Sequence, residues 1–248
     1  EPRMQMPKYN NSPLTEVVAE FYFQGSDWDL VIPGMLYEKL KETFPTRGMP
    51  RPAFIPNAQD LAPMMRTDRV FFSSKDERQL VQVGPNLLVV NNVKQYSQWE
   101  DFLPLVKSVF DTYSTVVPNW RLARMGLQYV NTLKLPAING RIDLEEFLEF
   151  RTYTGPNLPK DHGPFAMNVQ YQFQNSKESA VVVQLGNGKF ENGEEYNIIL
   201  DIKAVTLNNG TIDEKSIELW MNEAHENISK IFEGCLSEKL RSLFGEVN

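Results

Sequence analysis

The chain has 248 residues, of which 42% are hydrophobic and 23% are charged, a balance typical of soluble globular proteins. No apolar run approaches the roughly 20 residues that a membrane-spanning helix needs, so we expect no membrane contact. The formal net charge of −7 argues against an extended nucleic-acid interface, because phosphate binding depends on clustered lysine and arginine.

Targeting and cysteine usage are also informative. The N-terminal stretch EPRMQMPKYNN has no apolar segment of the kind found in secretory signals, which predicts a cytoplasmic protein. A single cysteine, Cys235, cannot form an intramolecular disulfide. With only two histidines beside it, a Cys/His zinc site is not expected either.

The first half of the chain predicts one strand, one helix, three strands and a second helix. Residues 15–23 alternate as a half-buried strand, with Val17, Ala19, Phe21 and Phe23 on one face and Glu16, Val18, Glu20 and Tyr22 on the other. Residues 33–44 predict a helix. A proline-rich loop over residues 45–65 is a candidate lid or partner-binding arm. Short strands over residues 69–73, 79–84 and 87–91 precede a helix over residues 99–117.

The second half repeats this order. It predicts a strand over residues 122–135, a short helix near residues 141–150, strands over residues 164–174, 179–188 and 196–206, and a C-terminal helix of about 30 residues from a capping box at Thr211. We therefore predict a single α+β domain over residues 1–248, with halves of about 13–118 and 119–248. Two β-α-β-β-β-α halves form a large, mostly antiparallel, curved sheet, and the long C-terminal helix packs on it.

Four segments carry a resemblance to a known family. They are NSPLTEVVAEFYF, WDLVIPGMLYEKLKETFP, LVQVGPNLLVVNNVKQYSQWEDFLPLV and RMGLQYVNTLKLP, in that order. Together they resemble a sporadically distributed, uncharacterised bacterial family of about 250 residues, with an N-P-P-[IL]-x-E-x-V start and an R-h-G-L-R-Y-[IV]-N strand. This chain has Ser12 and Gln128 where the family pattern often has proline and arginine. The resemblance implies a fold and a phage-defence or toxin–antitoxin setting.

Catalytic motifs are not evident. The sequence contains no G-x-S-x-G, H-E-x-x-H or P-loop spacing. We interpret His162 and His225 as structural or solvent-facing, and Cys235, on the apolar stripe of the last helix, as a small hydrophobic residue. Asn91, Asn92 and Asn131 are predicted to close turns, with contact to a ligand as the alternative.

Carboxylates offer an alternative chemistry. Glu16 and Glu20 point the same way on one strand but lie about 13 Å apart, too far to share an ion without a third ligand. Cross-strand pairs, such as Glu20 with Arg124 or Asp201 with Lys203, explain them more simply. We therefore expect no metal site and no cofactor. A metal-dependent enzyme acting on nucleotides or nucleic acid stays open as the alternative, if Glu16, Glu20 and Asp201 converge around a cavity.

Aromatic residues at element boundaries suggest a binding function. The turn from Gly25 to Pro33 carries Trp28 between two aspartates, and the corresponding segment of the second half, PAINGRID, has no tryptophan. We predict a non-enzymatic binding protein that recognises a partner protein or a small ligand; a homodimer through sheet edges also stays open. The candidate binding residues are Trp28, Asp29, Phe54, Tyr96, Trp99, Arg121 and Arg124.

Overall fold

The computed structural model describes residues 8–48, 69–93, 98–136, 142–153, 155–158, 164–173, 178–191, 195–207 and 210–247. Nine strands form one antiparallel sheet: β2 (Leu14–Gln24), β3 (Thr46–Gly48), β4 (Val70–Ser73), β5 (Gln79–Gly84), β6 (Leu87–Val93), β7 (Arg121–Pro136), β8 (Ala166–Tyr171), β9 (Ser179–Glu191) and β10 (Glu195–Thr206). A separate pair near the chain ends joins β1 (Lys8–Tyr9) to β11 (Glu246–Val247).

The strand order shows how the two halves meet. It runs β3-β4-β5-β6-β2-β7-β10-β9-β8, so β2 and β7, the first long strand of each half, lie side by side at the centre. On either side follows the last strand of the same half, β6 or β10, and then the strand before it. The expected fold class, an α+β protein with a large antiparallel sheet, is confirmed.

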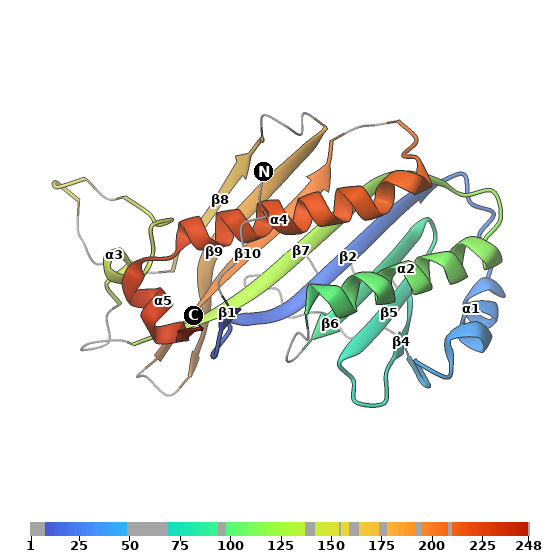
Figure 1. Ribbon diagram of the computed structural model, residues 1–248, viewed down its shortest axis with the longest axis horizontal. Coiled ribbons are helices and arrows are strands. Elements are labelled where there is room, and N and C mark those ends of the chain that lie inside the picture. Colours follow the sequence, from blue (N-terminus) through green and yellow to red (C-terminus); the bar gives the residue numbers. More distant parts are fainter. Residues whose placement is uncertain are drawn as a thin grey trace.

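Two long helices cover one face of this sheet. The helices of the described residues are α1 (Ile32–Leu40), α2 (Trp99–Val116), α3 (Leu144–Phe147), α4 (Ile217–Cys235) and α5 (Glu238–Phe244). Figure 1 shows α2 over the strands of the first half and α4 over those of the second, both on the same face. Since side chains alternate along a strand, every second residue of β2, β7 and β10 points away from these helices. We call this opposite side the helix-free face.

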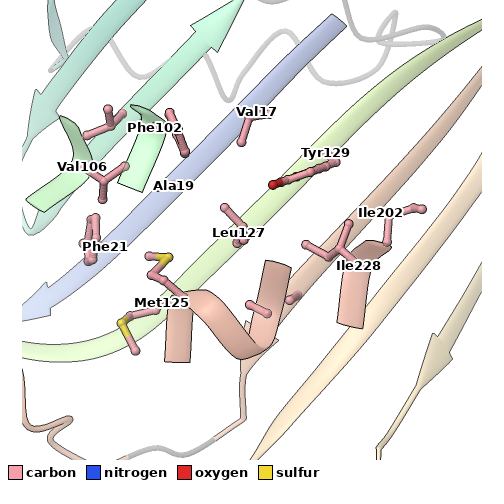
Figure 2. Close-up of a cluster of buried hydrophobic side chains, with 14 of the residues drawn as sticks. Val17, Ala19, Phe21, Phe102, Val106, Met125, Leu127, Tyr129, Ile202 and Ile228 are labelled. Atoms are coloured by element: carbon pink, nitrogen blue, oxygen red, sulfur yellow. The ribbon is translucent and has the colours of Figure 1, made fainter. Parts of the chain in front are cut away.

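The core lies between the sheet and the two long helices. Phe21 of β2 and Leu127 of β7 are fully buried, as are Phe102 of α2 and Ile228 of α4. Figure 2 shows these side chains meeting in one cluster. Two-residue periodicity in the strands and three- to four-residue periodicity in the helices bring these apolar side chains to one interior.

The C-terminal helix differs from the prediction of one continuous element. A short 3₁₀ turn at Glu214–Ser216 precedes α4, and its cap is Asp213, which accepts a hydrogen bond from the amide of Lys215, rather than Thr211. The helix ends at Cys235 because Leu236 forms a backbone bridge with Leu148. Ser237 then caps α5 by accepting a hydrogen bond from the amide of Leu240.

The strand asparagines were predicted wrongly as turn closers. Asn91, Asn92 and Asn131 are buried inside β6 and β7. Asn91 donates to a carboxylate oxygen of Glu16 at 2.7 Å, and Asn131 donates to the backbone carbonyl of Leu200 at 3.1 Å. The side chains of Asn91 and Asn131 therefore bond to neighbouring strands instead of ending their own, whereas the side-chain oxygen of Asn92 is buried without a hydrogen bond.

Two further features complete the description. None of the helices in the described part of the chain has the length and apolar character required to cross a lipid bilayer. Most of the loop predicted over residues 45–65 lies outside the described residues, together with His162.

Candidate functional site

An exposed apolar surface lies at the turn between β2 and α1. Leu30 is 95% exposed, Val31 64% and Met35 47%. Elsewhere in the described chain, no two exposed large apolar residues are adjacent in the sequence. Single exposed apolar side chains are ordinary on protein surfaces, whereas a cluster marks an interaction site. We call residues 28–35 the apolar turn; in Figure 1 it is the blue segment that joins the end of β2 to α1.

Hydrogen bonds from two neighbouring loops fix the start of this turn. The Ser26 hydroxyl donates to the side-chain carbonyl of Asn86 at 2.6 Å. The side-chain amide of Asn119 donates to the carboxylate of Asp27 at 2.6 Å, and the amide of Asp27 donates to the carbonyl of Pro118 at 3.2 Å. The loop before β6 and the loop before β7 thus both hold the segment that leads into the apolar turn.

Left-handed backbone conformations allow these loops to meet. Gly25, Asn86 and Asn119 have φ values of 66°, 56° and 56°. Glycine and asparagine adopt this region more readily than other residues, which explains their presence at these three bends. The sequence therefore specifies a fixed frame around the turn.

The second half of the turn is held by Asp29 and by the start of α1. One carboxylate oxygen of Asp29 accepts from the amides of Val31, at 2.7 Å, and Ile32, at 3.2 Å. Ile32 is buried and anchors α1 to the core, while Pro33 suits the first helical turn because no backbone N–H is needed there. Consequently Leu30 and Val31 are held at the surface between two fixed points.

The structure brings some of the predicted binding residues together and separates others. Trp28 is half-buried against the core beside Asp29, and Arg121 lies next to Gly25, whose Cβ would be 3.4 Å from the guanidinium. These residues surround the start of the apolar turn. Arg124 lies instead on the helix-free face, with its guanidinium carbon 4.1 Å from the centre of the Tyr22 ring.

Two of the remaining candidates cannot be placed and one lies elsewhere. Phe54 and Tyr96 are outside the described residues. Trp99 begins α2, whose 18 residues extend about 27 Å at 1.5 Å per residue, and the opposite end of this helix leads to the loop beside the turn. Trp99 therefore belongs to a different part of the molecule.

Trp99 contributes to a half-buried cluster around His225. Its indole stacks on the imidazole with 4.4 Å between ring centroids and an interplanar angle of 4°. The Tyr129 hydroxyl lies 2.6 Å from Nδ1 of His225, and the Trp99 indole N–H donates to Asn222 at 2.8 Å. Burial lowers the pKa of His225 to about 4, so the imidazole is neutral at pH 7. The cluster joins α2, α4 and β7.

Carboxylates gather near the centre of the helix-free face. Glu20 on β2 and Lys203 on β10 form an ion pair of 2.6 Å across β7. They meet over Gly126, where a Cβ would lie 3.0 Å from the Glu20 carboxylate and 3.3 Å from the Lys203 side chain. The absence of a side chain at Gly126 therefore makes this contact possible.

Side-chain amides donate to the neighbouring carboxylates of Asp201 and Glu16. Gln128 donates to one oxygen of Asp201 at 2.6 Å, while the other oxygen is buried without a hydrogen bond. Desolvation by burial raises the pKa of Asp201 to about 6 and also raises the pKa of Glu16. Within the described residues, no three His, Cys, Asp or Glu side chains are arranged to hold a metal ion.

Two other features bear on function. Cys235 is buried, and desolvation raises the pKa of its thiol to about 12, so the thiol is protonated at pH 7. An open groove of about 520 Å³ lies on the outer side of α2 and α4 and is lined mainly by polar side chains: Leu103, Pro104, Lys107, Ser108, Asp111, Thr112 and Glu218. Small-molecule sites are usually enclosed, whereas this groove is open to solvent.

No protein-family model matches the sequence, and no curated protein matches it. What the chain does must therefore be inferred from its own residues. Of the features described, the apolar turn combines exposed apolar area with a fixed backbone. The sequence points to this turn through Trp28, whereas its most exposed apolar side chains are Leu30 and Val31, which the sequence does not single out.

Proposed function

We propose that this chain is a non-enzymatic binding protein that recognises a partner protein through the apolar turn. The observation that carries the proposal is the near-complete exposure of Leu30 beside the exposed Val31, on a backbone held at both ends by hydrogen bonds. Burying a leucine or valine side chain contributes about 1.5 to 3 kcal/mol. A partner that covers both residues would gain a substantial part of its binding free energy there.

A protein fits this surface better than a small ligand does. The apolar turn is an exposed segment between a strand and a helix and lines neither of the described pockets, whereas small molecules bind in concave pockets that bury most of their surface. A partner protein can supply the complementary hollow. Because hydrogen bonds already order the turn, little conformational entropy is lost on binding, and this favours affinity.

The biological setting that we propose is a bacterial phage-defence or toxin–antitoxin system. This part rests on the family resemblance of the sequence segments alone. The alternative of a metal-dependent enzyme draws no support from the described carboxylates, because Glu20 is engaged by Lys203 and Glu16 by Asn91.

Affinity purification of the full chain from its native host tests the proposal. The test variant is the double substitution Leu30→Asp and Val31→Asp, which makes the exposed surface polar without touching a buried residue. The control is Leu219→Asp, because Leu219 on α4 is 64% exposed, as Val31 is. Circular dichroism and thermal melting verify that all forms fold.

We expect a stoichiometric companion protein with the wild type and with Leu219→Asp, and its loss with the double variant. Recovery of the chain without a companion would contradict the proposal. Equal recovery of the companion by all three forms would show that a different surface binds it.

A further inference from the structure

The two edges of the sheet differ in how they are protected. The edge strand β3 has three residues, including the exposed Arg47, and short charged edge strands resist pairing with other chains. The opposite edge strand, β8, has six residues with the sequence AMNVQY, which contains neither charge nor proline. Its register with β9 is continuous, and within the described residues no strand pairs with its outer side. This edge lacks the usual protection.

The backbone groups on this edge can be assigned from its pairing with β9. The amide of Asn187 donates to the carbonyl of Phe165, and hydrogen-bonded pairs alternate with non-bonded pairs in antiparallel sheets. Residues 167, 169 and 171 therefore bond to β9. The N–H and C=O groups of Ala166, Asn168 and Gln170 point outward, and all three residues are exposed.

We propose that β8 pairs with β8 of a second copy of this chain, antiparallel and about a two-fold axis at Val169, so that two nine-stranded sheets become continuous. An axis normal to the sheet keeps the helix-covered faces of both copies on the same side. Opposing residues of the two copies then lie on the same face of the sheet. Because side chains alternate between the faces along a strand, the axis must lie at a residue position, where that residue is opposite its own copy, and not midway between two consecutive residues.

Side-chain complementarity selects Val169 as the centre. In this register Asn168 lies opposite Gln170 of the second copy, which pairs two amides on the helix-free face. Met167 lies opposite Tyr171 of the second copy, a favourable sulfur–aromatic combination, on the helix-covered face. A register centred on Asn168 would instead place Gln170 opposite Ala166. In that register only Asn168 would face a polar residue, Asn168 of the second copy, whereas the first arrangement gives a polar partner to both Asn168 and Gln170.

Charge also favours a second copy at this edge. The chain carries a formal net charge of −7, so two copies repel each other overall. None of the six β8 side chains is charged, so this edge is a place where two copies can approach without like charges directly opposite one another. Tyr171 is 40% exposed, and Met167 and Val169 are half-buried, so pairing would cover further apolar area.

This interface is independent of the proposed partner-binding surface. The strand β8 is at one edge of the sheet, whereas the apolar turn follows the central strand β2 and lies far from it in Figure 1. Each dimer would thus leave two apolar turns uncovered. Failure of the dimer would not bear on the partner, and failure of the partner would not bear on the dimer.

Sedimentation equilibrium of the full chain, with a charge-exchange pair of variants, tests the interface. Asn168→Lys with Gln170→Lys places lysines opposite each other twice, and we expect the dimer dissociation constant to rise at least about tenfold. Asn168→Lys with Gln170→Glu places lysine opposite glutamate at the same positions, and we expect association to return. Thr46→Lys on the edge strand β3 is the control and should leave association unchanged.

Two results would overturn the proposal. One is a wild-type chain that stays monomeric over the whole concentration range, which would mean that β8 does not pair with a second copy of this chain. The other is a dimer that both double variants weaken equally. Asn168→Pro provides a further check, because it removes an outward N–H and spares the bonds to β9; a folded Asn168→Pro chain that still dimerises like the wild type would also contradict the proposal.

Discussion

Asn119 donates its side-chain amide to the Asp27 carboxylate at 2.6 Å and so ties the loop before β7 to the segment that leads into the apolar turn. The bond bridges the two halves of the chain, because Asp27 follows the first long strand and Asn119 precedes its counterpart. A partner that binds the apolar turn would therefore contact a surface to which both halves contribute.

Removing this bond should loosen the turn without unfolding the protein. Asn119→Gly keeps the left-handed backbone and loses the bond, whereas Asn119→Ala loses the bond and adds backbone strain of about 1 kcal/mol. We expect both variants to speed amide hydrogen exchange across residues 25–33. The alanine variant should also have the lower free energy of unfolding. Unchanged exchange in both would show that other contacts hold the turn.

The cluster around His225 predicts a pH dependence of stability. The folded-state pKa of about 4 lies below the usual value of 6.5, so unfolding takes up a proton between these pH values. Stability from this group is therefore present above pH 6.5 and is lost as the pH falls toward 4. Protonation would place a partly desolvated cation beside Trp99 and Tyr129, which is unfavourable. The negative charges of Glu100 and Glu226 offset part of this cost, because they favour the protonated imidazole.

Urea unfolding of His225→Phe measures this contribution. Phenylalanine can keep the stacking on Trp99 but does not titrate. The measured quantity is the free energy of unfolding of the wild type minus that of the variant. This difference should be about 3 kcal/mol larger at pH 7.5 than at pH 4. Parallel pH profiles of the two proteins would contradict the assignment of a buried, neutral imidazole.

Much of the fold follows from sequence periodicity, whereas the pairing of distant residues does not. The alternation in residues 15–23 and the three- to four-residue spacing of Ile217, Met221 and Ala224 predict β2 and α4, since both patterns are local. His225 was interpreted as structural, but its contacts with Trp99 and Tyr129 depend on strand register and helix placement. Those are properties of the whole sheet.

The apolar turn shows a second limit. Leucine and valine look the same in a sequence whether they are buried or exposed, so the sequence singles out the turn from Gly25 to Pro33 by Trp28 and not by Leu30 or Val31. The side chain of Ile32 does enter the core, whereas Leu30 and Val31 do not. The break after Cys235 was missed for a related reason, because it depends on the bridge between Leu236 and Leu148.

The contribution of Asp201 to the free energy of unfolding should change with pH in the opposite direction to that of His225. Its folded-state pKa of about 6 lies above the usual 3.8, so its favourable contribution is present below pH 3.8 and is lost as the pH rises through 6. Asp201→Asn keeps the shape and removes the charge. The variant should gain stability over the wild type by about 2.4 kcal/mol more at pH 8 than at pH 4, measured by urea unfolding. A constant difference between the two proteins would contradict this prediction.

The ion pair across Gly126 should contribute more than surface pairs do. The side chains of Glu20 and Lys203 are only 14% and 29% exposed, so Lys203→Met leaves a carboxylate largely removed from water, with Tyr22 as its remaining donor. We expect a loss of about 2 kcal/mol in the free energy of unfolding. Lys107→Met breaks the more exposed pair with Glu218 and should cost less than about 1 kcal/mol. Similar losses in both variants would contradict the difference that burial predicts.

The central claim, that the apolar turn binds a partner protein, is tested most directly by site-specific photo-crosslinking in the native host. A photoreactive amino acid replaces Val31 in one variant and Leu219 in the other, because both positions are 64% exposed. The proposal predicts one dominant covalent adduct with a second protein from position 31 and none from position 219. No adduct from position 31, or the same adducts from both positions, would contradict it.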